Sequence, residues 1–192
     1  YKIWKGQLLI MLYIMRHGKT DWNAVHKLQG SEDIPLNDEG RQMAAEAREK
    51  YKDLSFDICF CSPLQRARET AEIFLAGRDT PIRIDERLRE MSFGRFEGME
   101  GALENPDCPV YGLFHDPAHY EACGGAESLK EVFARSGSFI KEVLTPEFVQ
   151  EKNVLVVAHG GLNCSIIAQY ENTPLADFWK NLQGNCEVKR LV

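Results

Sequence analysis

The sequence predicts an α/β layered domain, because apolar strand segments alternate along the chain with amphipathic helix segments. Its 192 residues, 44% of them hydrophobic, suffice for a single domain with a substantial core. Two of the apolar runs, LYIM and VLVVA, lead into sequences that contain His-Gly. We therefore expect one domain over residues 11–192, with its polar chemistry gathered at the ends of strands.

Composition narrows the possible partners and the cellular location. The formal net charge is −6, which does not favour general binding to nucleic acid or to an anionic membrane. The apolar run over residues 8–15 is too short to span a bilayer and precedes no signal-peptide cleavage site. Six cysteines without a CxxC pair indicate reduced thiols and a cytoplasmic protein. Because Met11 directly precedes the first strand, we expect residues 1–10 to be an upstream extension or a residual expression sequence.

The first two expected elements are a strand and a helix. LYIM, residues 12–15, has the apolar character of a buried strand. After a polar loop, the pattern predicts a helix over residues 37–52, with Asn37 or Asp38 as its N-cap.

A second strand and helix follow. DICFC predicts a strand over residues 57–61. Ser62 is the expected N-cap of the next helix, Pro63 its first residue and Gln65 the partner in a capping box. Gly77 is expected to end this helix.

The C-terminal half contains a long irregular segment between regular elements. A short strand is expected over residues 81–85, and residues 91–125 have the glycine, proline and aspartate content of a surface loop or lid. A helix is predicted over residues 126–144. Residues 153–162 repeat the opening pattern of strand and His-Gly, and residues 186–192 form a terminal strand.

The two His-Gly sequences predict an anion site. LYIM leads into Arg16, His17 and Gly18, whereas VLVVA leads into His159 and Gly160. Because parallel α/β sheets bind ligands beyond the carboxyl ends of their strands, both histidines are expected to face one site. Glycines there allow close approach of the backbone, and helix N-termini favour a negative ligand.

Arg66 supports the same interpretation. It lies near the start of a predicted helix, where the helix dipole opposes a cation unless an anion binds beside it. Together with Arg16 it indicates bidentate recognition of phosphate. His26 and Arg68, by contrast, are expected on the surface.

Six blocks of the sequence together resemble the motifs of a known family. RHGKTDWN, LQGSEDIPLNDEGRQMA, CSPLQRARETA, LREMSFGRFEG, GGAES and VVAHGG are similar, in this order, to motifs of the histidine phosphatase superfamily, also called the phosphoglycerate mutase-like family. The resemblance covers residues 12–192. It implies a three-layer α/β/α sandwich with a mostly parallel sheet, and phosphoryl transfer through a phosphohistidine.

The resemblance also implies roles for individual residues. His17 is the implied nucleophile, and a neutral imidazole suits that role when its other N–H is held by a backbone carbonyl. Four glutamates in DERLREMSFGRFEGME could protonate the leaving group, and similarity to the LRE block selects Glu90. Catalytic roles thus fall to His17, Glu90 and His159, with the protonation of His159 left open. The implied substrate-binding residues are Arg16, Asn23, Gln29, Gly30, Arg66 and Gly160.

Three further carboxylates and one lysine lie in or near these motifs. Glu86, Glu97 and Glu100 are expected to be solvated or structural. Lys19 stands where the family more often has Glu or Gln, which predicts a more positive pocket mouth and a substrate with a second anionic group.

A zinc site in the lid is a weaker interpretation. Cys108, His115, His119 and Cys123 form the pattern C-x6-H-x3-H-x3-C, which is not a standard structural zinc spacing. We predict no metal and no cofactor, because the phosphohistidine mechanism needs neither.

The predicted function is a phosphomonoester phosphatase for a small phosphorylated metabolite, a histidine acid phosphatase-type phosphoric monoester hydrolase. Only 25 residues separate FGRFEG from GGAES, and no arginine-rich insertion resembling the mutase clamp for a sugar acid is visible. The first alternative is a cofactor-dependent phosphoglycerate mutase. A protein phosphatase and a non-catalytic phospho-ligand binder are further alternatives, and the presence of His17 and Glu90 disfavours pure binding.

Overall fold

The computed structural model describes residues 11–145 and 152–191. The expectation for residues 1–10 and the last residue of the expected 186–192 strand lie outside the described residues. Helices and strands occur in this chain order: β1 Met11–Arg16, α1 Asp21–Ala24, α2 Asp38–Lys50, β2 Ile58–Cys61, α3 Gln65–Leu75, β3 Ile82–Ile84, α4 Tyr111–His115, α5 Leu129–Val143, β4 Asn153–Ala158, α7 Gly160–Glu171 and β5 Val188–Arg190. Short 3-10 helices are η1 Glu86–Leu88, η2 Gly94–Phe96 and η3 Leu175–Asn181.

The described strands form one mostly parallel sheet in the order β3-β2-β4-β1-β5. Only β5 runs antiparallel to its neighbour, β1. The register pairs Arg16 at the end of β1 with Ala158 at the end of β4, and Cys61 of β2 with Val157. Residues 17, 62 and 159, which follow these strands, therefore emerge next to one another at the carboxyl edge of the sheet.

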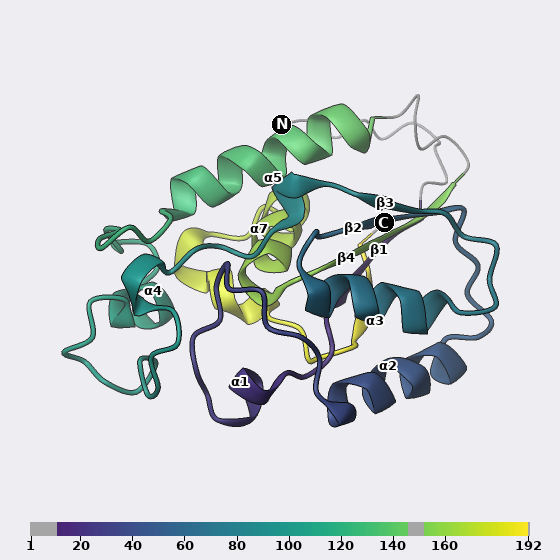
Figure 1. The fold of residues 1–192 in the computed structure, drawn as a ribbon. Helices are drawn as coiled ribbons and strands as arrows, with labels where there is room; N and C mark the ends of the chain where they lie inside the picture. Colours follow the sequence, from purple (N-terminus) through teal and green to yellow (C-terminus); the bar gives the residue numbers. More distant parts are fainter. Residues whose placement is uncertain (1–10, 146–151, 192) are drawn as a thin grey trace.

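Alternate strand side chains face two separate cores, one on each side of the sheet. Ile14 belongs to the core under α5 and α7, whereas the next residue, Met15, belongs to the core under α2 and α3. Figure 1 shows α2 and α3 on one side of the sheet and α5 on the other. The expected three-layer α/β/α fold with a mostly parallel sheet is confirmed.

The helix start expected at residue 37 or 38 is confirmed by its cap, whereas the helix expected from residue 126 begins at Leu129. Asn37 precedes α2, and its side-chain oxygen accepts the N–H of Gly40. Ser128 precedes α5 and forms a reciprocal capping box with Glu131. These local side-chain contacts satisfy N–H groups that have no partner within the helix.

The predicted capping box at Ser62 is wrong. Helix α3 begins at Gln65, and Leu64 precedes it without a side-chain cap. Ser62 instead lies at the carboxyl end of β2, where its Oγ is 2.7 Å from His159 Nε2. The same Oγ still accepts the N–H of Leu64 at 3.3 Å, but the backbone and side-chain N–H groups of Gln65 donate to Asp33 and not to Ser62.

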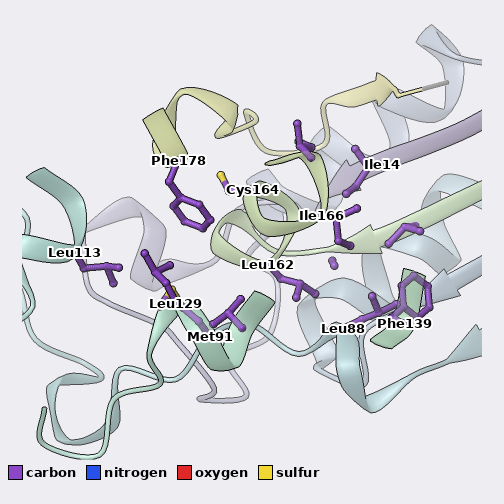
Figure 2. Close-up of a cluster of buried hydrophobic side chains, with 14 of the residues drawn as sticks. Ile14, Leu88, Met91, Leu113, Leu129, Phe139, Leu162, Cys164, Ile166 and Phe178 are labelled. Carbon is purple, nitrogen blue, oxygen red and sulfur yellow. The ribbon is translucent and has the colours of Figure 1, made fainter. Parts of the chain in front are cut away.

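Residues 91–125 have little regular structure, as expected, and several of their side chains are buried. Met91, Phe96 and Leu113 are among several buried side chains of this segment. Figure 2 shows Met91 and Leu113 in one cluster with Leu162 of α7 and Phe178 of η3. This segment, which we call the lid, therefore contributes side chains to the core.

No helix in the described part of the chain has both the length and the apolar character needed to cross a membrane.

We expect the Phe74→Ala substitution to lower the free energy of unfolding by about 3–5 kcal/mol, because it leaves a cavity in the core under α2 and α3. The matched control is Ile82→Ala on the edge strand β3, where the side chain is already 36% exposed. Its effect should stay below about 1 kcal/mol. Urea denaturation of both variants measures the difference, and equal losses would contradict the two-core packing.

Candidate active site

Two buried histidines, His17 and His159, lie side by side at the carboxyl edge of the sheet. The N–H of His17 donates to Ala158 O at 3.0 Å, across β1 and β4. The two ring centroids are 5.0 Å apart, and the residues are 3% and 0% exposed. The parallel register thus brings together the two histidines that the sequence analysis selected.

The hydrogen bonds of His17 leave one ring nitrogen free. Its Nδ1 is 2.6 Å from Gly18 O, which can only accept, so Nδ1 carries a proton. Nε2 has no protein partner among the described residues. Burial first, and then the charges of Arg66 and Arg16, hold the pKa of His17 well below the ordinary value of 6.5. The ring is therefore a neutral imidazole with an exposed lone pair on Nε2, held by the backbone carbonyl that the sequence analysis expected.

The protonation of His159, left open by the sequence, follows from its two contacts. Nδ1 lies 3.2 Å from Arg66 Nε, which can only donate, so Nδ1 carries no proton. Nε2 then holds the proton of the neutral ring and donates to Ser62 Oγ at 2.7 Å. Burial, followed by the charge of Arg66, holds the pKa of His159 well below 6.5.

Arg16 and Arg66 supply two guanidinium groups beside these rings. Arg66 is fully buried, and its Nη1 and Nη2 donate to Glu32 O at 2.6 Å and Gly30 O at 2.7 Å. Arg16 Nη1 donates to Gln183 O at 2.8 Å, while its Nε is buried without a protein partner among the described residues. Burial lowers the pKa of Arg66 to about 10, which leaves the group charged at neutral pH.

Neither guanidinium forms an ion pair with a carboxylate in the described part of the chain. All of their protein acceptors are neutral: backbone oxygens and, for Arg66, the ring of His159. The positive charge of this edge therefore remains available to an anionic ligand.

Two side-chain amides are oriented by Thr20. The Thr20 N–H donates to Asn23 Oδ1 at 3.2 Å, and its hydroxyl lies 2.9 Å from Gln29 Oε1. Because both amide oxygens are occupied by Thr20, both NH2 groups point away from it and remain without a protein acceptor among the described residues. Asn23, Gln29 and the Gly160 N–H at the start of α7 are thus further donors for an anion.

Glu90 lies at the amino end of α7. Its Oε1 accepts the N–H groups of Met91 and Leu162 at 2.9 Å each, and its Oε2 accepts that of Gly161 at 3.0 Å. A Cβ on Gly161 would lie 3.0 Å from Oε1, so any larger residue would press on the carboxylate. Burial lowers the pKa of both arginines, and the charge of Glu90 opposes that shift. A carboxylate thus lies near the cationic edge without binding to it.

The site residues come from motifs that span nearly the whole chain, and a family model covers the same range. The model of the histidine phosphatase superfamily (branch 1) matches residues 12–192. The chain belongs to the histidine phosphatase superfamily.

Individual relatives support the same assignment. The glucosyl-3-phosphoglycerate phosphatase of Mycobacterium tuberculosis is 33% identical over 180 residues, which are 90% of this chain and 80% of that protein. The 2-carboxy-D-arabinitol-1-phosphatase of Triticum aestivum is 35% identical over 90% of this chain, but the chain spans only 35% of that protein's length. A solved structure of a mycobacterial glucosyl-3-phosphoglycerate phosphatase with VO3 superposes with a TM-score of 0.82, at 31% identity, over 94% of this chain and 91% of that one.

The sequence patterns did not identify two polar residues of this site, Ser62 and Thr20. Ser62 directly follows β2, just as His17 and His159 follow their strands. The rule that ligands bind beyond strand ends could therefore have selected it. Thr20 caps α1 as a local capping box, and nothing in that local pattern reveals its contact with Gln29.

Glu97, expected to be a solvated or structural carboxylate, holds the loop that binds Arg66. Its Oε1 accepts both the N–H and the hydroxyl of Ser31 at 2.9 Å, and the N–H of Phe93 at 2.9 Å. Gly30 has a φ of +55°, and a Cβ there would collide with Glu97 Oε1. Glu97 is thus structural, and it joins the lid to the two carbonyl groups that orient Arg66.

The remaining candidates lie outside the central site. Lys19 forms an ion pair with Glu39 of α2 at 2.5 Å, which offsets the positive charge expected at the pocket mouth. His26 and Arg68 are exposed, as expected.

The cysteines and histidines of the lid are not gathered at one point. Cys108 is buried, whereas Cys123 is exposed. His115 contacts a backbone oxygen of the lid, and the exposed ring of His119 has its Nδ1 2.9 Å from Asp116 Oδ1. Among the described residues, no three histidine, cysteine or acidic side chains lie close enough together to hold a metal ion.

We expect His17 and His159 to stay neutral at pH values where an exposed histidine is half protonated. Because their folded pKa values lie below 6.5, the unfolded chain binds protons first as the pH falls, and the free energy of unfolding decreases below about pH 6.5. NMR titration of the ring nitrogens measures the pKa values directly. A pKa at or above 6.5 for either ring would contradict the proton assignment.

We expect Glu97→Gln to weaken the binding of inorganic phosphate by about tenfold, because the loop that orients Arg66 loses its carboxylate anchor. Glu100→Gln is the matched control, since Glu100 lies in the same lid but forms an exposed pair with Lys27. Isothermal titration with phosphate measures both dissociation constants. The interpretation of Glu97 is wrong if the two variants bind phosphate equally well.

Proposed function

We propose that this protein is a phosphomonoester phosphatase that forms a phosphohistidine on His17 in each turnover. The observation that carries the proposal is a buried, neutral imidazole whose free Nε2 lies beside two guanidinium groups without carboxylate partners. A neutral imidazole is a nucleophile near pH 7, and two cations match the charge of a phosphate dianion. Membership of the histidine phosphatase superfamily supports the same chemistry.

The first chemical step is attack of His17 Nε2 on phosphorus. A bond forms between Nε2 and phosphorus while the bond from phosphorus to the ester oxygen breaks. The ring gains positive charge, and Gly18 O stabilises it through the Nδ1 proton. Arg16 Nε and Arg66 bind phosphoryl oxygens, and His159 shares its Nε2 proton between Ser62 and the phosphate. The further proposed donors to the phosphate are the side-chain amides of Asn23 and Gln29 and the N–H of Gly160. Gly30, which directly follows Gln29, holds Arg66 through its carbonyl oxygen.

Glu90 is the proposed general acid and base. Oε1 already accepts two N–H groups, whereas Oε2 accepts only one, so Oε2 has a lone-pair position left for a proton. In the first step this proton goes to the leaving alkoxide. In the second step Glu90 removes a proton from the water that attacks the phosphohistidine, which releases phosphate and restores both groups.

The proposed substrate is a small phosphorylated metabolite. The relatives named above are phosphatases for glucosyl-3-phosphoglycerate and for 2-carboxy-D-arabinitol 1-phosphate, both phosphate esters of polyhydroxylated acids. A panel of sugar phosphates and phosphorylated sugar acids, assayed for phosphate release, is the experiment that identifies the substrate. The cytoplasm stays the proposed location, supported by six cysteines that form no disulfide.

A phosphoglycerate mutase remains the alternative within the same family. Such an enzyme must hold the carboxylate of its substrate, yet the lid contains one arginine, Arg95, against six acidic residues. This balance favours the phosphatase. Formation of 2-phosphoglycerate from 3-phosphoglycerate, faster than phosphate release and dependent on bisphosphoglycerate, would establish the mutase instead.

We expect His17→Ala to lose at least about a thousandfold in turnover, because the chain then has no nucleophile between the two arginines. His119→Ala, which removes an exposed histidine of the lid, is the matched control and should leave turnover unchanged. Phosphate release from an aryl phosphate measures both variants.

The intermediate can also be observed directly. Brief reaction with an aryl phosphate, followed by mass spectrometry at mildly alkaline pH, should detect one acid-labile phosphoryl group on His17. Full turnover by His17→Ala would overturn the mechanism.

A further inference from the structure

Arg135 of α5 forms a bidentate ion pair with Glu127, just before the capping box of that helix. Its Nε donates to Glu127 Oε1 at 2.7 Å, and its Nη2 donates to Oε2 at 2.9 Å. Both side chains are largely buried, at 21% and 18% exposed. A parallel pair of hydrogen bonds fixes the guanidinium plane more rigidly than a single contact.

The same pair binds the backbone on both sides of Glu90. Arg135 Nη1 donates to Arg87 O and to Arg89 O, each at 2.7 Å. On the far side, Glu127 Oε2 accepts the N–H of Ser92 at 3.3 Å, and the Glu127 N–H donates to Ser92 O at 2.8 Å. The chain on either side of residue 90 is therefore held by one rigid ion pair.

The opposite side of Glu90 is also fixed, by the first turn of α7. The carboxylate accepts N–H groups of Gly161 and Leu162, and a Cβ at Gly161 would lie only 3.0 Å from both Glu90 Oε1 and Met91 Sδ, so those side chains would have to shift. Glu90 is therefore enclosed between α7 and the ion pair. Loss of the ion pair would free the backbone of residues 87–92 to shift and would move Oε2.

We propose that Arg135 and Glu127 are positioning residues for the general acid of this enzyme. They act through Glu90 and make no contact with the substrate, and the inference rests on the proposed function of Glu90. Displacement of a catalytic group by about 1 Å is enough to cost about a hundredfold in rate. The pair therefore controls the proton transfer to the leaving group, and among the described residues Arg135 makes no hydrogen bond to Arg16, Arg66 or His159.

Proton transfer to the leaving group can be separated from loss of folded enzyme. The alkoxide of an aliphatic alcohol needs a proton as it leaves, whereas p-nitrophenolate leaves readily without one. The ratio of kcat/KM for p-nitrophenyl phosphate to kcat/KM for glycerol 2-phosphate thus reports the general acid alone. A fall in the fraction of folded protein lowers both values equally and leaves the ratio unchanged.

The test uses Arg135→Gln and Glu127→Gln in the full chain. We expect kcat/KM for glycerol 2-phosphate to fall by about 10- to 100-fold, and that for p-nitrophenyl phosphate by less than about threefold. Arg135→Lys should not restore the ratio, because an ammonium group cannot form the planar fork to Glu127 and also reach both carbonyl oxygens. The matched control is Arg89→Gln, which removes only an exposed pair with Glu86 and should leave both substrates unaffected.

A double-mutant cycle with Glu90→Gln completes the test. If Arg135 acts through Glu90, Arg135→Gln changes the ratio no further once Glu90 is replaced. An unchanged ratio in both single variants, or a further change in the Glu90→Gln background, would overturn the inference. If Glu90→Gln itself leaves the ratio unchanged, the proposed role of Glu90 fails first and this inference fails with it.

Discussion

The site depends on one constraint, the placement of one buried and one half-buried guanidinium group without carboxylate partners at the carboxyl edge of the sheet. A buried charge is costly unless it is well solvated by protein dipoles. Arg16 and Arg66 are accordingly surrounded by backbone carbonyl oxygens and by the unprotonated Nδ1 of His159. Their charge, added to burial, keeps both histidines neutral. In the proposed function, a phosphate dianion supplies the negative charge that no carboxylate places against these two groups.

The neighbouring carboxylates are placed so that they do not compete with such a ligand. Glu90 binds N–H groups at the start of α7, and Glu97 binds N–H groups of the lid and of the loop at Ser31. Direct ion pairs with Arg66 would occupy donors that a phosphate needs. Binding the carboxylates to backbone dipoles keeps them close to the cationic edge without occupying any guanidinium donor.

Local sequence patterns predicted much of the fold and selected the main site residues. The cap at Asn37 lies within a few residues of the N–H group that it binds, so a local pattern was sufficient. The capping box expected at Ser62 was wrong because Gln65 binds Asp33, 32 positions away, and the Ser62 hydroxyl also contacts His159, 97 positions away. The packing of the lid was missed for a similar reason, since its apolar residues are spaced irregularly and meet α7 and η3 only in the folded protein.

By itself, the sequence determined the alternation of strands and helices and the position of His17 and His159 directly after two strands. It also determined the motifs that assign the chain to its superfamily. Only the tertiary structure decided which ring nitrogens carry protons, how the two amides are oriented by Thr20, and that Arg135 and Glu127 enclose Glu90. The physical reason is that a hydrogen bond between distant segments depends on strand register and helix packing, which no local pattern specifies.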